Sequence, residues 1–150
     1  MSKGIMTFKT SSVAETQALA VAFSRVLKPG MVLAYFGGLG AGKTAFTRGL
    51  AKGLNVKGEV SSPTFALVHE YQGDPPLIHF DMYRISSEDD LYTTGYFDYL
   101  DGNNIVAIEW SENIEDFLPE NTIRISFEIT DENSRWIVIE GGPDFEYSCH

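Results

Sequence analysis

A glycine-rich segment at residues 37–44, Gly-Gly-Leu-Gly-Ala-Gly-Lys-Thr, most constrains what this 150-residue chain can fold into. It fits the pattern Gly-x4-Gly-Lys-[Ser/Thr] at every fixed position. Glycines let the backbone curl until successive N–H groups face one anion. The apolar run Met31–Phe36 before it is predicted to be a strand, and Lys43–Leu54 after it a helix with one apolar stripe. This order of strand, loop and helix predicts a phosphate-binding loop.

The chemistry of this loop predicts a nucleoside triphosphate and Mg²⁺ as ligands. Lys43 is expected to lie along the β- and γ-phosphates, and Thr44 to offer its hydroxyl to Mg²⁺. The helix that follows directs the positive end of its dipole at the same phosphates. The residues predicted to contact the nucleotide are Gly38, Leu39, Gly40, Ala41, Gly42, Lys43, Thr44 and Ala45.

Two carboxylates are candidates for holding Mg²⁺ and acting on water. Asp81 ends the run Leu77–Asp81 and Glu109 ends the run Ile105–Glu109, and both runs are typical of strands. Open α/β sheets bind ligands at the carboxyl ends of their strands, so both acids are predicted to lie at the site. An acid at a strand end is more often a solvated residue or a helix cap, and the sequence does not rank the two.

The segment Ser61–Phe65, Ser-Ser-Pro-Thr-Phe, supplies a further candidate. It follows the predicted loop helix, where related folds place a segment that senses the γ-phosphate. Thr64 would then complete the Mg²⁺ shell. The equally weighted alternative is a simple turn that leads into a strand.

Three other residues have two interpretations each. We expect His79 to be packed between strands rather than catalytic. Arg84 is either a stabiliser of transferred charge or a member of an ion pair within the acidic part of the chain. We expect Trp110 to lie in the core or on a partner surface rather than to stack on a base.

The remaining periodicity predicts an α/β protein with a mixed sheet flanked by helices and a C-terminal antiparallel hairpin. One domain is expected over residues 1–150, with a core at about 5–140 and a tail at 141–150. A capping box at 12–15 opens a helix to about residue 27, with Ala18, Ala22, Val26, Leu19 and Phe23 facing inward. The other expected elements are strands at 5–9, 65–71, 77–82 and 105–110, short helical turns at 88–93 and 96–100, and hairpin strands at 123–129 and 136–140.

Composition narrows the cellular setting and the class of partner. The chain is 43% hydrophobic and has one cysteine, Cys149, so neither a disulfide framework nor a zinc site is expected. No apolar run reaches the roughly 18 residues of a membrane span, and no signal peptide is recognisable, so we expect a cytoplasmic protein. The net charge is −10, divided as +6 over residues 1–60 and −16 over 61–150. Direct stable binding of nucleic acid by this chain alone is therefore not expected, whereas a basic protein surface is a suitable partner.

Four motifs together resemble the TsaE (YjeE) family of small bacterial P-loop ATPases. They are Gly-Leu-Gly-Ala-Gly-Lys-Thr at 38–44, Ser-Pro-Thr-Phe at 62–65, His-Phe-Asp-Met-Tyr-Arg at 79–84 and Ile-Glu-Trp at 108–110. The resemblance covers about residues 10–140.

The resemblance implies hydrolysis of ATP with Mg²⁺, in support of threonylcarbamoyl-adenosine modification of tRNA. It implies an accessory ATPase that depends on a TsaB–TsaD complex, and functional roles for Lys43, Thr44, Asp81 and Glu109. Many members have Asp where this chain has Gly38 and Pro where it has Ser111. Neither position supplies the lysine or the metal ligand of the loop, so we expect neither difference to affect catalysis.

Other classes of function fit the sequence less well. A small-molecule P-loop kinase needs several cations at its acceptor site. Beyond residue 60 the chain has only Arg84, Arg124 and Arg135. A GTPase usually carries an Asn-Lys-x-Asp-type motif, and this chain has no lysine after Lys57. A nucleotide-gated scaffold that does not hydrolyse ATP is an alternative that the sequence does not exclude, because binding uses the same loop as hydrolysis.

Overall fold

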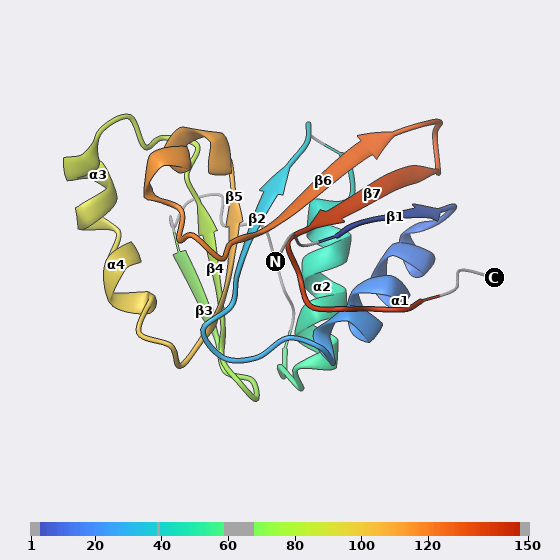
Figure 1. Cartoon of the computed structure of the whole chain (residues 1–150), viewed down its shortest axis with the longest axis horizontal. Helices are drawn as coiled ribbons and strands as arrows, with labels where there is room; N and C mark the ends of the chain where they lie inside the picture. Colours follow the sequence, from blue (N-terminus) through green and yellow to red (C-terminus); the bar gives the residue numbers. More distant parts are fainter. Residues whose placement is uncertain (1–3, 39, 59–67, 148–150) are drawn as a thin grey trace.

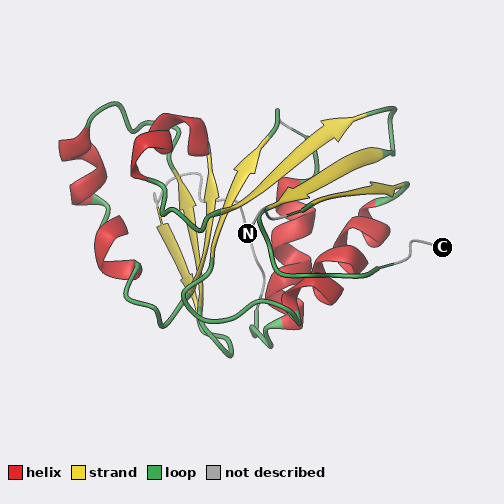
Figure 2. Ribbon diagram, viewed as in Figure 1, coloured by secondary structure: helices red, strands yellow, loops and turns green. Residues whose placement is uncertain are grey.

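The protein is built on a seven-stranded mixed sheet with helices on both faces (Figures 1 and 2). The computed structural model describes residues 4–38, 40–58 and 68–147. The strand order is β1-β7-β6-β2-β5-β4-β3. The strands are β1 (Ile5–Thr10), β2 (Val32–Phe36), β3 (Val68–Tyr71), β4 (Leu77–Asp81), β5 (Ile105–Glu109), β6 (Ile123–Ile129) and β7 (Arg135–Glu140).

The parallel part of the sheet lies at its centre. β2 pairs in parallel with β5 on one side and with β6 on the other, and β5 pairs in parallel with β4. Antiparallel strands complete both sides, because β6 and β7 form a hairpin, β1 adds to β7, and β3 pairs with β4. The predicted mixed sheet and C-terminal hairpin are therefore confirmed, and the carboxyl ends of β2, β4 and β5 meet at one edge.

The two faces of the sheet carry different helices and separate cores (Figure 1). Helices α1 (Val13–Ser24) and α2 (Lys43–Gly53) cover one face. Helices α3 (Glu88–Thr93) and α4 (Tyr96–Tyr99) and the 3-10 helix η1 (Ser111–Phe117) lie on the other. Strand side chains alternate between the faces. Leu77 on β4 belongs to the α1–α2 core, whereas its neighbour Ile78 belongs to the other core.

Helix α1 begins as predicted and buries part of the face predicted for it. Ser12 Oγ accepts a hydrogen bond from the Glu15 amide at 3.1 Å, as a capping box requires. Leu19 and Phe23 are buried as expected and Val26 packs against the α1–α2 core, whereas Ala18 is exposed, so the expectation was wrong for Ala18, and Ala22 is only half-buried. The buried residues are Thr16, Leu19, Ala20, Phe23 and Ser24. An alanine-rich helix offers nearly equivalent faces, so its partner helix determines which one is buried.

Element boundaries differ from the predictions by a few residues. Helix α1 ends at Ser24 rather than near residue 27, and β5 ends at Glu109 rather than Trp110. The 3-10 helix η1, which follows a left-handed turn at Trp110, was not predicted. The predicted strand at 65–71 is present as β3 over 68–71, and its first three positions lie outside the described residues.

The described part of the C-terminal tail packs against the α1–α2 core. The ring of Phe145 lies 5.1 Å from that of Phe23 and 5.7 Å from that of Phe8, centroid to centroid. Tyr147 stacks on Phe145 at 5.9 Å. Phe145 and Tyr147 therefore add to the hydrophobic core, although the sequence analysis assigned them to a tail beyond the domain core at about 5–140. Among the described helices, none is long and apolar enough to cross a membrane.

Candidate functional site

The glycine loop joins the carboxyl end of the central strand β2 to helix α2. Gly37 and Gly42 occupy two fixed positions of the loop motif and have φ angles of 143° and 106°, which L side chains rarely adopt. A Cβ on Gly37 would also lie 2.6 Å from the Phe127 carbonyl oxygen. Gly42 is the N-cap of α2, so the amides that begin this helix face the loop. The motif glycines are thus required by the backbone path.

Lys43 is folded into this loop. Its Nζ donates a hydrogen bond to the Gly37 carbonyl at 2.8 Å and lies 5.8 Å from the centroid of the Trp110 ring. Only 7% of the residue is exposed. Thr44 is half-buried at the first turn of α2, and Gly38 and Gly40 are exposed. Leu39, which we also predicted to contact the nucleotide, lies outside the described residues.

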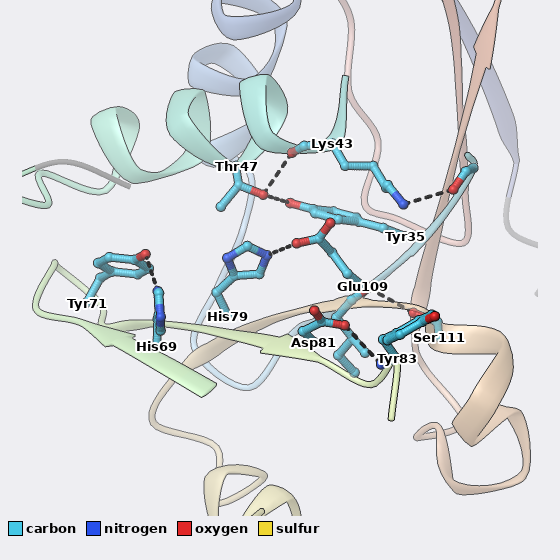
Figure 3. Close-up of polar contacts among 12 residues, drawn as sticks. Tyr35, Lys43, Thr47, His69, Tyr71, His79, Asp81, Tyr83, Glu109 and Ser111 are labelled. Carbon is cyan, nitrogen blue, oxygen red and sulfur yellow. Dashed lines mark hydrogen bonds and ion pairs between the residues drawn. The ribbon is translucent and has the colours of Figure 1, made fainter. Parts of the chain in front are cut away.

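A buried chain of hydroxyls ties the first turn of α2 to the sheet (Figure 3). Thr47 Oγ1 lies 2.9 Å from Tyr35 Oη and 3.0 Å from the Lys43 carbonyl oxygen. A carbonyl can only accept, and a threonine hydroxyl has one hydrogen. The consistent arrangement is therefore that Tyr35 donates to Thr47, which donates to Lys43. Burial raises the pKa of Tyr35, so its hydroxyl stays protonated and available as a donor.

The two predicted carboxylates lie side by side at the sheet edge, close to the loop. Asp81 at the end of β4 is the register partner of Glu109 at the end of β5 (Figure 3). Asp81 Oδ1 accepts the Tyr83 amide at 2.9 Å. Burial raises the pKa of Asp81, and the Tyr83 hydrogen bond opposes that shift. Glu109 is 7% exposed, and its Oε2 lies 2.7 Å from Nε2 of the fully buried His79.

This donor set suits Mg²⁺ better than a metal held entirely by protein ligands. The described residues contain no group of three or more His, Cys, Asp or Glu side chains that could hold a metal ion. Mg²⁺ usually takes one or two carboxylates and completes its shell with water and substrate phosphates. The carboxylates of Asp81 and Glu109 and the Thr44 hydroxyl match that requirement. Thr64, the further candidate ligand, lies outside the described residues.

Several residues at the site were missed or left undecided by sequence reasoning. Arg135 Nη2 donates to the Gly40 carbonyl of the loop at 3.0 Å, a contact that spans 95 positions and has no local signal. Trp110 is half-buried and packs against the α3–α4 core, as one of its two interpretations expected, and its ring lies beside Lys43 and 4.8 Å from that of Tyr83. Arg84 is exposed and forms no ion pair with a described acidic residue. His79 is fully buried on β4, as expected of a residue packed between strands, but it also contacts Glu109.

A narrow cleft adjoins the glycine loop. Ser12 and Thr16 of α1, Gly42 of the loop, and Asn133 and Arg135 of the β6–β7 hairpin line part of this cleft, which has a volume of about 100 Å³. A larger cavity of about 730 Å³ lies at the opposite end of α2, and none of the described residues that line it is a predicted site residue. The chemistry of the loop, rather than cavity size, therefore locates the site.

The fold and the loop define a P-loop-like α/β protein. A family model described as "Threonylcarbamoyl adenosine biosynthesis protein TsaE" matches residues 10–137. Two similar proteins carry the name "tRNA threonylcarbamoyladenosine biosynthesis protein TsaE". The one from Treponema pallidum (strain Nichols) is 37% identical over 128 residues, covering 85% of this chain and 95% of that protein. The one from Bacillus subtilis (strain 168) is 38% identical over 144 residues, covering 95% and 90%.

A solved structure agrees with these matches. The crystal structure of Bacillus subtilis YdiB aligns with a TM-score of 0.79 at 32% identity, covering 95% of this chain and 89% of that chain. The chain belongs to the TsaE family of tRNA threonylcarbamoyladenosine biosynthesis.

Proposed function

We propose that this protein binds and hydrolyses ATP with Mg²⁺, as an accessory ATPase for threonylcarbamoyl-adenosine modification of tRNA in complex with TsaB–TsaD. One observation carries the proposal. The glycine loop ends at the N-terminus of α2, with Lys43 inside it, and two register-paired carboxylates lie on the neighbouring strands. A structural βα turn requires neither the enclosed lysine nor the paired acids.

Each residue of the site has a distinct role in this proposal. The loop amides and the N-terminus of α2 hold the phosphates, and Lys43 Nζ leaves the Gly37 carbonyl for the β- and γ-phosphates. Thr44 and Asp81 hold Mg²⁺, whose charge neutralises the phosphate oxygens when it is bound. Glu109 orients the attacking water and accepts its proton.

The cleft beside the loop is the proposed place for the base and ribose of the nucleotide. It lies on the side of the loop that faces α1 and the β6–β7 hairpin. Ser12 and Asn133 line it with residues that carry a hydroxyl and an amide group, which are suitable partners for ribose hydroxyls and a purine edge.

The site is short of positive charge for rapid hydrolysis by this chain alone. Transfer of the γ-phosphoryl group is accelerated by cations, and an added arginine alone can contribute about 10³–10⁵. Arg124 forms an ion pair with Glu115, and Arg135 is engaged by carbonyl groups of the loop and the hairpin turn. Arg84, which is exposed three residues after Asp81, is then the remaining arginine of the acidic part of the chain, and we propose that a partner supplies the further positive charge, in line with dependence on TsaB–TsaD.

The first test measures nucleotide binding. Lys43→Ala should weaken binding of Mg²⁺–ATP by about ten- to a hundredfold, because it removes a charge-assisted contact of about 1.5–3 kcal/mol. The matched control is Lys52→Ala, which removes an exposed lysine from the last turn of the same helix. Undiminished affinity of the Lys43 variant by calorimetric titration would refute the phosphate-loop assignment.

The second test separates the two carboxylates. Asp81→Asn should weaken Mg²⁺-dependent binding, whereas Glu109→Gln should leave binding nearly intact and lower turnover. Phosphate release by the assembly with TsaB–TsaD provides the second measurement. If both variants hydrolyse ATP at the parent rate, neither carboxylate is catalytic.

The third test concerns the partner. Turnover by the isolated protein should be slow, should rise on addition of TsaB–TsaD, and should lose that rise at high salt because exposed complementary charges are screened. Full-rate turnover without the partner would favour a self-sufficient enzyme such as a small-molecule kinase. Nucleotide binding with no phosphate release in the assembly would favour a nucleotide-gated scaffold.

A further inference from the structure

A buried histidine lies beneath the reaction edge of the sheet. His79 is 0% exposed and sits on β4, two residues before Asp81 and therefore on the same face of the strand. Its same-face neighbours are Leu77 and Asp81 along β4, Ala107 as register partner on β5 and His69 as register partner on β3. A titratable side chain is therefore buried directly behind the acidic strand ends.

The imidazole makes its close polar contact with Glu109. Nε2 lies 2.7 Å from Oε2 (Figure 3), and the contact is an ion pair that does not count as a hydrogen bond. Among the described residues, Nδ1 and Nε2 of His79 and Oε2 of Glu109 have no other hydrogen-bond partner. The two side chains are buried together, 0% and 10% exposed.

Stability alone does not account for this pair. Burying a charged or polar pair is often no better than packing apolar residues of similar volume, and it leaves polar atoms to be satisfied. A buried group without a partner in a native structure calls for an explanation, and a role in catalysis is one such explanation. The site itself supplies that reason, because the carboxylate that His79 contacts is the one on which the proposed reaction depends.

We propose that His79 is a positioning residue for Glu109. Its Nε2 holds Oε2, so that the carboxylate keeps one orientation and presents Oε1 to the reacting water. The inference rests on the proposed ATP hydrolysis, because it concerns the residue assigned to the attacking water. A misplaced catalytic group lowers the rate of the chemical step without altering contacts to the phosphates, since those are made by the loop.

Three substitutions at one position test the assignment. In glutamine the side-chain nitrogen reaches approximately the position of Nε2, in asparagine it reaches only that of Nδ1, and leucine has no donor. With TsaB–TsaD present, His79→Leu and His79→Asn should lower kcat by about tenfold to a hundredfold. His79→Gln should restore most of that loss, and calorimetric affinity for Mg²⁺–ATP should stay within about twofold for all three variants. His69→Gln on β3 is the control for a histidine that contacts Tyr71 instead of Glu109.

Equal kcat values for the three His79 variants would overturn the proposal, as would a loss of affinity that parallels the loss of kcat. A failure of the proposed function is recognised separately, because the parent assembly would then release no phosphate or Glu109→Gln would leave turnover unchanged.

A stability measurement tests the contact without any turnover. His79→Leu should lower the Tm of the parent, because it leaves the buried Glu109 carboxylate without its partner. In a Glu109→Leu background that loss should be at least halved, since no carboxylate remains. The same Tm loss in both backgrounds would refute the positioning contact.

Discussion

The close crossing of α1 and α2 predicts that Gly49→Ala destabilises the protein. Gly49 lies on α2, the helix that carries Lys43 and Thr44. A Cβ added there would lie 2.3 Å from the Gln17 carbonyl oxygen and 2.6 Å from the Ala20 Cβ, both on α1. Ordinary contacts begin at 3.4 Å, so the two helices would have to separate by about 1 Å at this point. The backbone carbonyl cannot rotate away as the end of a side chain can.

The expected magnitude is the difference between two opposing effects. Overpacking costs about 1–3 kcal/mol, and a clash with backbone should fall at the upper end of that range. Alanine gains about 1 kcal/mol over glycine in a helix. The net loss of about 2 kcal/mol corresponds to a Tm lower by about 4–8 °C for a chain of this size.

Thermal unfolding of the parent and two variants provides the assay. Gly38→Ala is the control, since a Cβ at Gly38 meets nothing within 4 Å, and its Tm should stay within about 2 °C of the parent. If Gly49→Ala raises the Tm, as alanine does at an open helix position, then the two helices do not cross at this glycine.

Two further predictions concern buried and half-buried polar groups near the loop. Tyr35→Phe should lower the Tm by about 2–4 °C through the loss of roughly 1 kcal/mol from its contact with Thr47, and combining it with Thr47→Val should cost less than the sum of the single changes. Additive losses would mean that the two hydroxyls are not coupled. Because burial raises the pKa of Asp81 above its ordinary 3.8, its carboxylate lowers stability above the folded-state pKa, and this cost disappears as the pH falls below the unfolded value. Asp81→Asn, measured without metal or nucleotide, should therefore stabilise the protein more at pH 7 than at pH 3.5. A stabilisation that is larger at pH 3.5 would contradict the direction of the shift.

Local signals predicted the loop and most strands because they depend on neighbouring residues. The apolar run of β2, the glycines and the stripe of α2 predict the strand, loop and helix without knowledge of the rest of the fold. The same reasoning was right for Leu19 and Phe23 of α1 but wrong for Ala18, because it did not place the centre of the buried face. That face is determined by Gly49 of α2, which lets Gln17 and Ala20 approach closely. The sequence of α1 contains no pattern that predicts its contact with Gly49.

The site was predictable to the extent that it follows from strand ends. Asp81 and Glu109 were expected at one sheet edge, and the parallel register pairs them directly. The contact of His79 with Glu109 depends on that register, which the sequence does not specify. The contact of Arg135 with the loop depends on the return of the β6–β7 hairpin past Gly40. Long-range geometry thus determined the residues that sequence reasoning missed.

The turn that follows Glu109 holds a bulky residue in an unfavourable backbone conformation. Trp110 has a φ of 59°, and the other described non-glycine residue with positive φ is Asn55, a residue type that tolerates it. The Trp110 carbonyl accepts the Asn113 amide at 3.1 Å, and Asn113 Nδ2 donates to the Met82 carbonyl at 2.8 Å. These bonds fasten the turn and η1 to the residue after β4, so the surrounding structure keeps the strained conformation in place.

Two substitutions of Trp110 separate this strain from the role of its ring. Trp110→Gly and Trp110→Ala both remove the ring beside Lys43 and Tyr83, but only alanine keeps the left-handed penalty of about 1–2 kcal/mol. The glycine variant should therefore have the higher Tm, by about 2–8 °C. At an unstrained position the order is reversed, because glycine loses more conformational entropy on folding. An alanine variant at least as stable as the glycine variant would show that the turn relaxes once the ring is gone. In that case the ring itself, held beside Lys43, imposes the strain at the end of β5.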